Sequence, residues 1–139
     1  MSIVWYKYIM SSKKGKSRRK GEFEKTLSHY KQIYNRFGSI KCPAFNNAEV
    51  VFNTTGWNHL CNGKWRTEKE QMKRMELLPY AKKLIGLTTT IQSIRTYHGF
   101  RTFEFNANMD GMKITAIVSQ TKRGYVFLSN FRDDSEGLL

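Results

Sequence analysis

Cysteine, proline and histidine are scarce in this chain of 139 residues, which contains two Cys, two Pro and three His. Cys42 and Cys61 lack the spacing of a CxxC pair, and the histidines are too scattered to complete a zinc site within one stretch of sequence. The sequence therefore implies no metal and no cofactor. A disulfide between the two cysteines stays open, although two cysteines in a chain of this size are more often reduced thiols.

Long apolar runs are also missing. No stretch approaches the ~20 apolar residues that cross a membrane. The opening residues, MSIVWYKYIM, lack the charged start and long apolar centre of a signal peptide. We therefore expect a soluble, cytoplasmic protein without a membrane partner.

Acidic residues are few, with 11 Asp plus Glu against 24 Lys plus Arg and a formal net charge of +13. Such a surface attracts polyanions, of which RNA and DNA are the commonest in a cell; the alternative is a basic surface kept for solubility or for docking an acidic protein. Hydrophobic residues make up 40% of the chain, enough for one core and one domain.

Composition divides the chain into a basic N-terminal segment over 1–21, a single domain over 22–132 and a short acidic tail over 133–139. The stretch Ser11–Gly21 is almost entirely Lys, Arg, Ser and Gly, which predicts a flexible arm. This arm is either a solvated linker or a contact for nucleic-acid phosphates. Because Lys and Arg carry no sequence information by themselves, it would raise affinity without selecting a site.

Apolar residues at steps of three and four predict an amphipathic helix over Glu22–Phe37, ended by Gly38, with His29 at the boundary of its apolar face. The stretch SIKCPAFNNA is expected to be a loop because of its Pro and paired Asn, and Glu49–Asn53 is expected to be a short strand.

Two further helices are expected after this strand. Thr54 or Thr55 can cap a short helix that carries His59, and Thr67 with Glu70 forms the TxxE capping box of the next helix. Pro79 must kink that helix or divide it.

After Leu87 the sequence predicts four strands separated by His98-Gly99, Asp110-Gly111 and Arg123-Gly124. Phe103 and Phe105 alternate with polar residues, which indicates one buried and one wetter face. The expected class is α+β, with N-terminal helices packed on a four-stranded antiparallel meander sheet.

The segment Phe52–Arg66 places His59 close to two cations, Lys64 and Arg66. Cleavage of RNA without a metal needs a base for the 2′-hydroxyl proton and cations for the charge that develops on phosphorus. Histidine suits the proton-transfer role because it titrates near neutrality, and Lys64 and Arg66 suit the phosphate role. By itself, this combination is more often structural than catalytic.

The order VVFNTTGWNHL, a basic break, a helix with KRMELLPYAKKLI, and strands with KITAIVSQ and YVFLSNF resembles the small nucleases of the barnase, EndoU, colicin and RelE superfamily. The resemblance covers roughly 50–131 and is closest to the phage- and toxin-associated branches. It implies a metal-independent ribonuclease that acts on tRNA or mRNA and leaves 2′,3′-cyclic phosphate ends. It also implies a possible immunity or antitoxin protein as partner.

The resemblance implies a set of site residues. The catalytic candidates are His59, Arg66, Thr121 and Ser129. The substrate-binding candidates are Lys64, Arg101, Ser119, Lys122 and Trp57. Each also has a plain explanation, since strand hydroxyls can face solvent, turn-adjacent cations can be ordinary surface charges, and Trp57 and Trp65 can belong to the core.

Three alternatives remain open at this point. His98, in a turn, rivals His59 as the catalytic histidine because turn tips are exposed and often carry function. The second alternative is a non-catalytic RNA- or DNA-binding module. The third is a phage regulator that binds an acidic protein.

Overall fold

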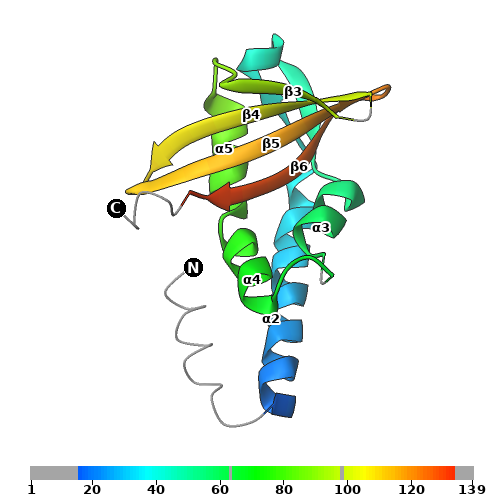
Figure 1. The fold of residues 1–139 in the computed structure, drawn as a ribbon, viewed down its shortest axis with the longest axis vertical. Coiled ribbons are helices and arrows are strands. Elements are labelled where there is room, and N and C mark those ends of the chain that lie inside the picture. Colours follow the sequence, from blue (N-terminus) through cyan, green and yellow to red (C-terminus); the bar gives the residue numbers. More distant parts are fainter. Residues whose placement is uncertain (1–15, 63, 98, 134–139) are drawn as a thin grey trace.

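The computed structural model describes residues 16–62, 64–97 and 99–133, which form four α-helices, one 3-10 helix and six β-strands. The elements follow one another as α2 (Lys16–Phe37), β1 (Ser39–Cys42), η1 (Pro43–Phe45), β2 (Ala48–Val51), α3 (Thr54–Leu60), α4 (Glu68–Glu76), α5 (Leu78–Leu87), β3 (Ser93–Tyr97), β4 (Phe100–Met109), β5 (Met112–Thr121) and β6 (Gly124–Arg132). The α+β class is confirmed, and most of the helices precede the strands of the meander (Figure 1).

The first helix is longer than its apolar pattern predicts. It begins at Lys16 instead of Glu22 and ends before Gly38, which adopts a left-handed backbone with φ of 61°. The prediction of a flexible arm is therefore wrong for residues 16–21. These residues extend the helix, because Lys and Arg are good helix formers. The rest of the arm, residues 11–15, lies outside the described residues, as do residues 134–139 of the acidic tail.

The predicted four-stranded antiparallel sheet is incomplete. Strands β3 to β6 do form an antiparallel meander with the predicted turns, but the sheet has six strands in the order β1-β2-β6-β5-β4-β3. The stretch predicted as a loop contains β1, and Asn46 and Asn47 adopt positive φ in the turn to β2. This hairpin joins the meander through β2, which pairs with β6 in parallel, so the sheet is mixed.

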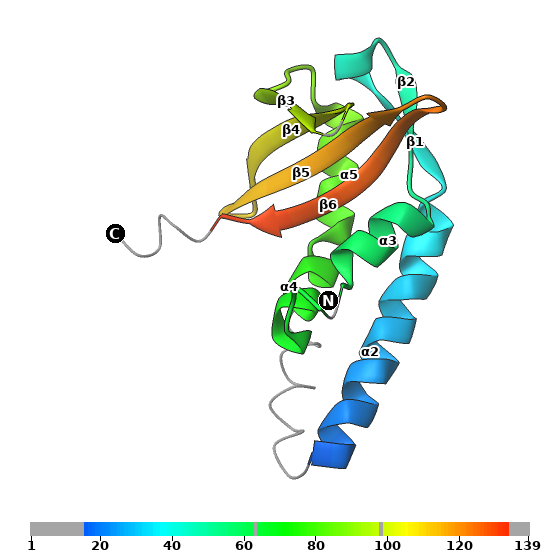
Figure 2. The same cartoon turned by 45° about the vertical axis from the view of Figure 1, so that its right-hand side comes forward.

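The helices cover the sheet in two ways. Figures 1 and 2 show α5 lying across one face of the sheet, while α3 and α4 lie against β6 and α2 runs alongside them. The predicted alternation in β4 is confirmed, since Phe103 and Phe105 are buried beneath α5 and η1. No helix in the described part of the chain is long and apolar enough to cross a membrane.

The local signals for α3, α4 and α5 are largely confirmed. Thr67 caps α4, because its Oγ1 accepts a hydrogen bond of 3.2 Å from the backbone N–H of Glu70. Pro79 lies in the first turn of α5, where its missing N–H costs nothing, so it divides the predicted helix. The predicted cap of α3 is wrong: Asn53, not a threonine, accepts the bond of 3.0 Å from the backbone N–H of Thr55.

Tyr34 joins α2 to the region that carries His59. Its ring lies among the rings of Trp57 and Phe127, and its hydroxyl donates a hydrogen bond of 2.6 Å to the backbone oxygen of Asn53. Because Asn53 caps α3, this bond fixes the start of that helix relative to α2. Burial raises the pKa of Tyr34, which keeps the hydroxyl protonated as a donor.

Gly56 lets α3 approach β6 closely, and this contact gives a stability prediction. A Cβ at Gly56 would overlap the backbone oxygen of Phe127 and lie 2.6 Å from the Tyr34 hydroxyl. We expect Gly56→Ala to lower the free energy of unfolding by about 1–3 kcal/mol, the usual cost of overpacking. Urea denaturation followed by circular dichroism measures this change.

Gly86→Ala is the matched control for that prediction. Gly86 is also helical, but a Cβ there would meet only the end of the flexible Ile40 side chain, at 2.5 Å from Cδ1. We expect little loss or a small gain in stability, because alanine favours a helix over glycine by about 1 kcal/mol. Equal effects of the two substitutions would show that α3 is not held against the backbone of β6.

Candidate functional site

His59 lies in the last turn of α3, on the border between the buried and the exposed side of the helix. Trp57 and Leu60 are buried and anchor α3 to the core, while His59 between them is partly exposed. This spacing follows from the helical repeat, which turns neighbouring residues to different sides. His59 therefore lies neither in the core nor free in solvent. A group that exchanges protons with a ligand needs such a position.

Asn62 organises the segment that follows α3. Its backbone oxygen accepts hydrogen bonds from the backbone N–H groups of Trp65 and Arg66, at 3.2 and 2.9 Å. Its side-chain oxygen accepts a hydrogen bond of 3.0 Å from the backbone N–H of Lys64. The chain therefore folds back toward α3. The Arg66 side chain then donates a hydrogen bond of 2.9 Å from Nη1 to the backbone oxygen of His59.

Helix α4 adds a second arginine to this place. Arg74 forms an ion pair with Glu70, with 3.1 Å between Nε and Oε1, and its side chain is only 17% exposed. Arg74 was not among the site residues predicted from the sequence. Its steps of three from Gln71 and four from Leu78 place it on the same side of the helix as two buried residues, but this spacing does not reveal its partners on β6.

Arg74 also binds β6. Its Nη1 donates to Ser129 Oγ at 3.0 Å and to the backbone oxygen of Asn130 at 3.4 Å. In return, the side-chain amide of Asn130 donates to the backbone oxygen of Arg74 at 3.0 Å. Val118 pairs with Phe127 and Ile117 with Ser129, so β6 contains a bulge between these partners. Bulges redirect the side chains that follow them, which accounts for two consecutive buried polar residues, Ser129 and Asn130.

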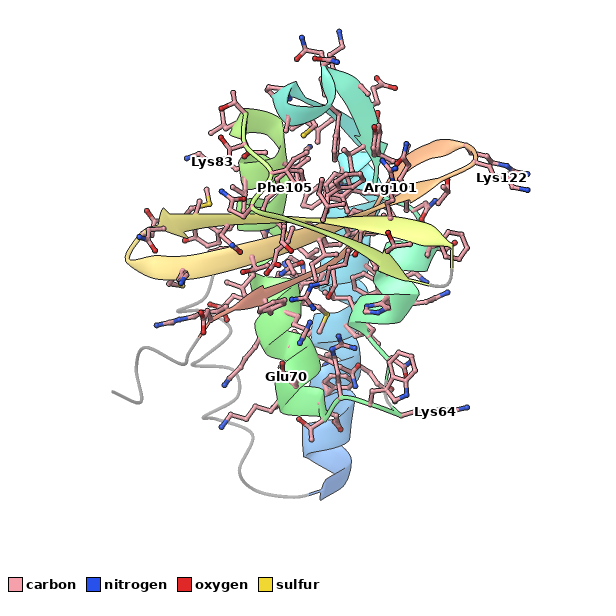
Figure 3. The ribbon with its side chains drawn as sticks, turned by 45° about the horizontal axis from the view of Figure 1, so that its top comes forward. Lys64, Glu70, Lys83, Arg101, Phe105 and Lys122 are labelled. Carbon is pink, nitrogen blue, oxygen red and sulfur yellow. The ribbon has the colours of Figure 1, made fainter. Side chains whose placement is uncertain are left out.

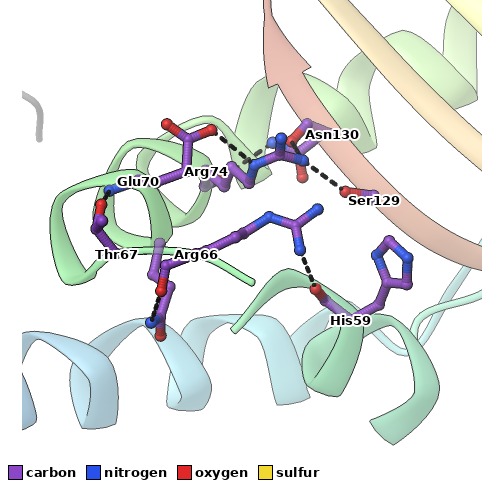
Figure 4. A network of polar contacts seen from close by, with 8 residues as sticks. His59, Arg66, Thr67, Glu70, Arg74, Ser129 and Asn130 are labelled. Carbon is purple, nitrogen blue, oxygen red and sulfur yellow. Dashed lines mark hydrogen bonds and ion pairs between the residues drawn. The ribbon is translucent and has the colours of Figure 1, made fainter. Parts of the chain in front are cut away.

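These contacts bring four side chains together, which we call the His59 cluster: His59, Arg66, Arg74 and Ser129. Figure 4 shows the guanidinium groups of both arginines near one another, with His59 and Ser129 beside them. The group combines residues from α3, the segment after it, α4 and β6. Three of its members, His59, Arg66 and Ser129, were predicted site residues.

The electrostatics of the His59 cluster favour a neutral imidazole. Burial lowers the pKa of His59 below its ordinary value of 6.5, and the positive charges of Arg66 and Arg74 lower it further. Burial also lowers the pKa of the Arg66 guanidinium, as does Arg74, while Glu70 acts in the opposite direction. Two neighbouring guanidinium groups repel each other, so an anion bound between them would be stabilised.

Several polar atoms of this region are buried without hydrogen-bond partners among the described residues: His59 Nδ1, Arg66 Nε and Asn130 Oδ1. Such atoms are rare in folded proteins and concentrate at functional sites. Protonation of His59 would place an N–H group at Nδ1 with no protein acceptor, which agrees with its lowered pKa.

Arg74 also borders a groove of about 340 Å³ on the side of α4 that faces the end of β6. The groove is lined by Glu70, Lys73, Arg74, Glu76, Leu77, Met112, Phe131 and Arg132. The guanidinium carbon of Arg74 lies 5.4 Å from the centre of the Phe131 ring. One arginine thus belongs both to the His59 cluster and to a neighbouring groove whose walls carry charges of both signs and one aromatic ring.

Trp57 and Trp65 differ clearly in their exposure. Trp57 is only 6% exposed and packs against Tyr34 with 5.5 Å between ring centres, so it belongs to the core, and little of its ring is left for the predicted substrate contact. Trp65 is 71% exposed. Its ring lies edge-to-face with the His59 ring, with 6.1 Å between centres.

Other predicted residues lie away from the His59 cluster. Thr121 closes the β5–β6 turn by donating a hydrogen bond of 3.0 Å to the backbone oxygen of Gly124, and the strand from Gly124 to Ser129 spans about 16 Å at the usual rise per residue. Ser119 pairs with Val126 in the same part of the sheet. Both hydroxyls lie on a strand that was predicted, but they lie near the β5–β6 turn, away from the His59 cluster.

The predicted cationic residues also lie in different parts of the structure. Figure 3 shows Lys122 at the tip of the β5–β6 turn and Arg101 on the sheet, both far from Lys64 and Glu70. Lys64 is exposed next to Trp65 and two residues before Arg66 of the His59 cluster. His98, the rival catalytic histidine, lies outside the described residues.

Both cysteines are free thiols, Cys42 buried and Cys61 partly buried, so the open question of a disulfide is answered against it. Comparison of the chain with protein-family models, curated protein sequences and solved structures gave no significant match. The function is therefore inferred from the chemistry of the His59 cluster.

Proposed function

We propose that this protein is a metal-independent endoribonuclease whose active site is the His59 cluster. The observation that supports this most strongly is a partly exposed histidine of lowered pKa beside two arginines. A neutral imidazole is a general base at neutral pH, and paired guanidinium groups are a phosphate site. The net charge of +13 suits a polyanionic substrate.

In the proposed reaction, His59 accepts the proton of a ribose 2′-hydroxyl, and the 2′ oxygen attacks the adjacent phosphorus. The bond from phosphorus to the 5′ oxygen breaks, and that oxygen takes a proton from solvent. The products are a 2′,3′-cyclic phosphate and a 5′-hydroxyl. Arg66 and Arg74 stabilise the additional negative charge on the phosphoryl oxygens, a role for which cations held in place before the reaction are effective.

Ser129 has a different role in this proposal from the one its position in the sequence implies. It is 1% exposed and accepts a hydrogen bond from Arg74, so it positions the guanidinium and does not itself contact substrate. The positive charges of the cluster disfavour binding of a metal cation beside them, which agrees with a mechanism driven by histidine and arginine. Glu70, the nearby carboxylate, is engaged by Arg74.

The membership of the barnase, EndoU, colicin and RelE superfamily stays a prediction, as does an inhibitor protein as partner. The antiparallel meander after the helices agrees with that resemblance, whereas the hairpin that adds β1 and β2 departs from the expected sheet. An inhibitor would need acidic residues to cover the two arginines. The choice between tRNA and mRNA as substrate is likewise part of the proposal and rests on the resemblance.

The test is incubation of the purified chain with a synthetic RNA in excess EDTA, with mass spectrometry of the ends. We expect cleavage that leaves 2′,3′-cyclic phosphate and 5′-hydroxyl termini. A matched RNA with 2′-O-methyl groups at every position should resist cleavage, because it lacks the nucleophile. Products with 5′-phosphate ends, or activity that EDTA abolishes, would overturn the proposal, and tight binding without cleavage would favour the non-catalytic module.

A further inference from the structure

We propose that Trp65 is a stacking platform for one unpaired nucleobase next to the scissile phosphate, so that the substrate is single-stranded RNA. This inference rests on the proposed function, because it takes the arginines of the His59 cluster as the phosphate site. It adds a substrate class and a residue that selects it.

The exposure of Trp65 is the first observation. An indole loses the benefit of apolar burial when it stays in water, and burying a large side chain is among the strongest contributions to folding. Trp57, the other tryptophan in the described residues, takes that benefit and is only 6% exposed, whereas Trp65 is 71% exposed. Trp65 contributes little to the core, so its indole is available to a ligand.

The position of Trp65 is the second observation. Its neighbour Arg66 is anchored to the backbone oxygen of His59, and the Trp65 ring lies edge-to-face against the His59 ring. In this arrangement one nucleotide can place its phosphate at Arg66 while an adjacent base covers the indole. Asn62 holds the backbone of both residues through its own oxygen, so the platform is formed before substrate arrives.

The surrounding charge is the third observation. Lys64 is exposed on one side of Trp65 and Arg66 lies on the other, so cations flank the aromatic ring along the chain. Aromatic rings interleaved with cations are the usual means by which proteins bind single strands, since every base has a face that can stack. A duplex hides these faces within its own stack, so a stacking platform selects against paired RNA.

The test measures binding of short RNAs with a single 2′-deoxy residue at the cleavage site, which prevents cleavage. One nucleotide at a time is replaced by an abasic residue. With the unaltered protein, we expect loss of one base beside the cleavage site to weaken binding about 5- to 100-fold, the usual value of a stacked base. Trp65→Ala should bind the intact RNA with a similar loss and become insensitive to that abasic position, while Trp65→Phe should retain part of the sensitivity.

Leu87→Ala is the control, because Leu87 is also an exposed apolar side chain, 66% exposed, at the end of α5. Its affinity should equal that of the unaltered protein. Annealing the RNA to its complement should weaken binding to the unaltered protein by a similar factor. A Trp65→Ala protein that binds as tightly as the unaltered protein, or that responds to each abasic position in the same way, overturns the platform.

The two proposals fail in different ways. RNA that is bound through Trp65 but never cleaved, with all 2′-hydroxyl groups present, would refute the ribonuclease and leave the platform supported. Efficient cleavage with equal kcat and KM for Trp65→Ala and the unaltered protein would refute the platform and leave the ribonuclease supported.

Discussion

Replacement of His59 by alanine should lower the turnover of RNA by ~10²- to 10⁴-fold, the usual contribution of a positioned general acid or base. Affinity for uncleavable RNA should stay nearly unchanged, because the imidazole moves a proton without holding the phosphate. Single-turnover cleavage of one defined RNA measures the effect, and circular dichroism checks the fold. The partly exposed position of His59 makes alanine tolerable in α3.

His29→Ala is the matched control for this substitution. His29 is also a helical histidine, but it is exposed on α2, where its ring lies near that of Tyr30 with 5.3 Å between centres. We expect unaltered rates for it. Full activity of a folded His59→Ala protein would refute the assignment, and the same measurement on His98→Ala would then identify or dismiss the rival histidine.

The second large effect is expected at Arg66. Arg66→Met keeps the aliphatic stem of the side chain but loses the guanidinium beside the phosphate. We expect kcat/KM to fall by ~10²- to 10³-fold, as for removal of one donor that stabilises transition-state charge. A change mainly in KM would show that Arg66 binds substrate and transition state equally, whereas a change in kcat would show selective stabilisation of the transition state.

Arg66→Met should also move the pH profile in a defined direction. In the proposed mechanism neutral His59 is the active form, so the rate should rise with pH through the pKa of His59, and the acid limb should lie below the ordinary value of 6.5. Arg66 is one of two positive charges that lower this pKa, and its loss should shift the limb to higher pH. Burial and Arg74 remain, so the limb should stay below 6.5.

Lys64→Met provides the comparison for Arg66→Met. It removes the same formal charge from the same segment, but Lys64 is exposed and does not lower the pKa of His59. The acid limb should not move, and the loss of affinity should be modest and sensitive to salt. Identical pH profiles for the unaltered protein and Arg66→Met would contradict the assignment of His59 as the titrating base.

Local signals explain why much of the fold could be predicted. The helix that carries Tyr34, the cap at Thr67, the break at Pro79 and the glycine-containing turns between β3 and β6 all depend on residues close together in sequence. The short strand predicted at Glu49–Asn53 corresponds to β2, but β1 and the hairpin were missed because β1 is short and the turn residues, Asn46 and Asn47, also suit a loop. Its parallel pairing with β6 depends on residues far away in the chain.

The candidate site was predictable only in part, for the same reason. His59 and Arg66 are close in sequence, and a hydrogen bond joins them in space. Arg74 was missed because its partners on β6 are 55 and 56 residues away, too far for any periodic pattern to reveal. Thr121 was placed in the site by the resemblance, whereas Arg74 of α4 bonds to Ser129 and Asn130, away from the β5–β6 turn that Thr121 closes.

The contact between Arg74 and β6 has a consequence for solubility. Strand β2 pairs with β6 only at Tyr125 and Val126, so within the described residues the later part of β6 has a partner strand on one side alone. Exposed strand edges of this kind recruit other chains. Arg74 lies against this edge instead: its Nη1 donates to the backbone oxygen of Asn130, and its backbone oxygen accepts from the side-chain amide of Asn130. In the proposed function the same arginine binds phosphate, so a substitution of Arg74 should promote self-association as well as lower activity.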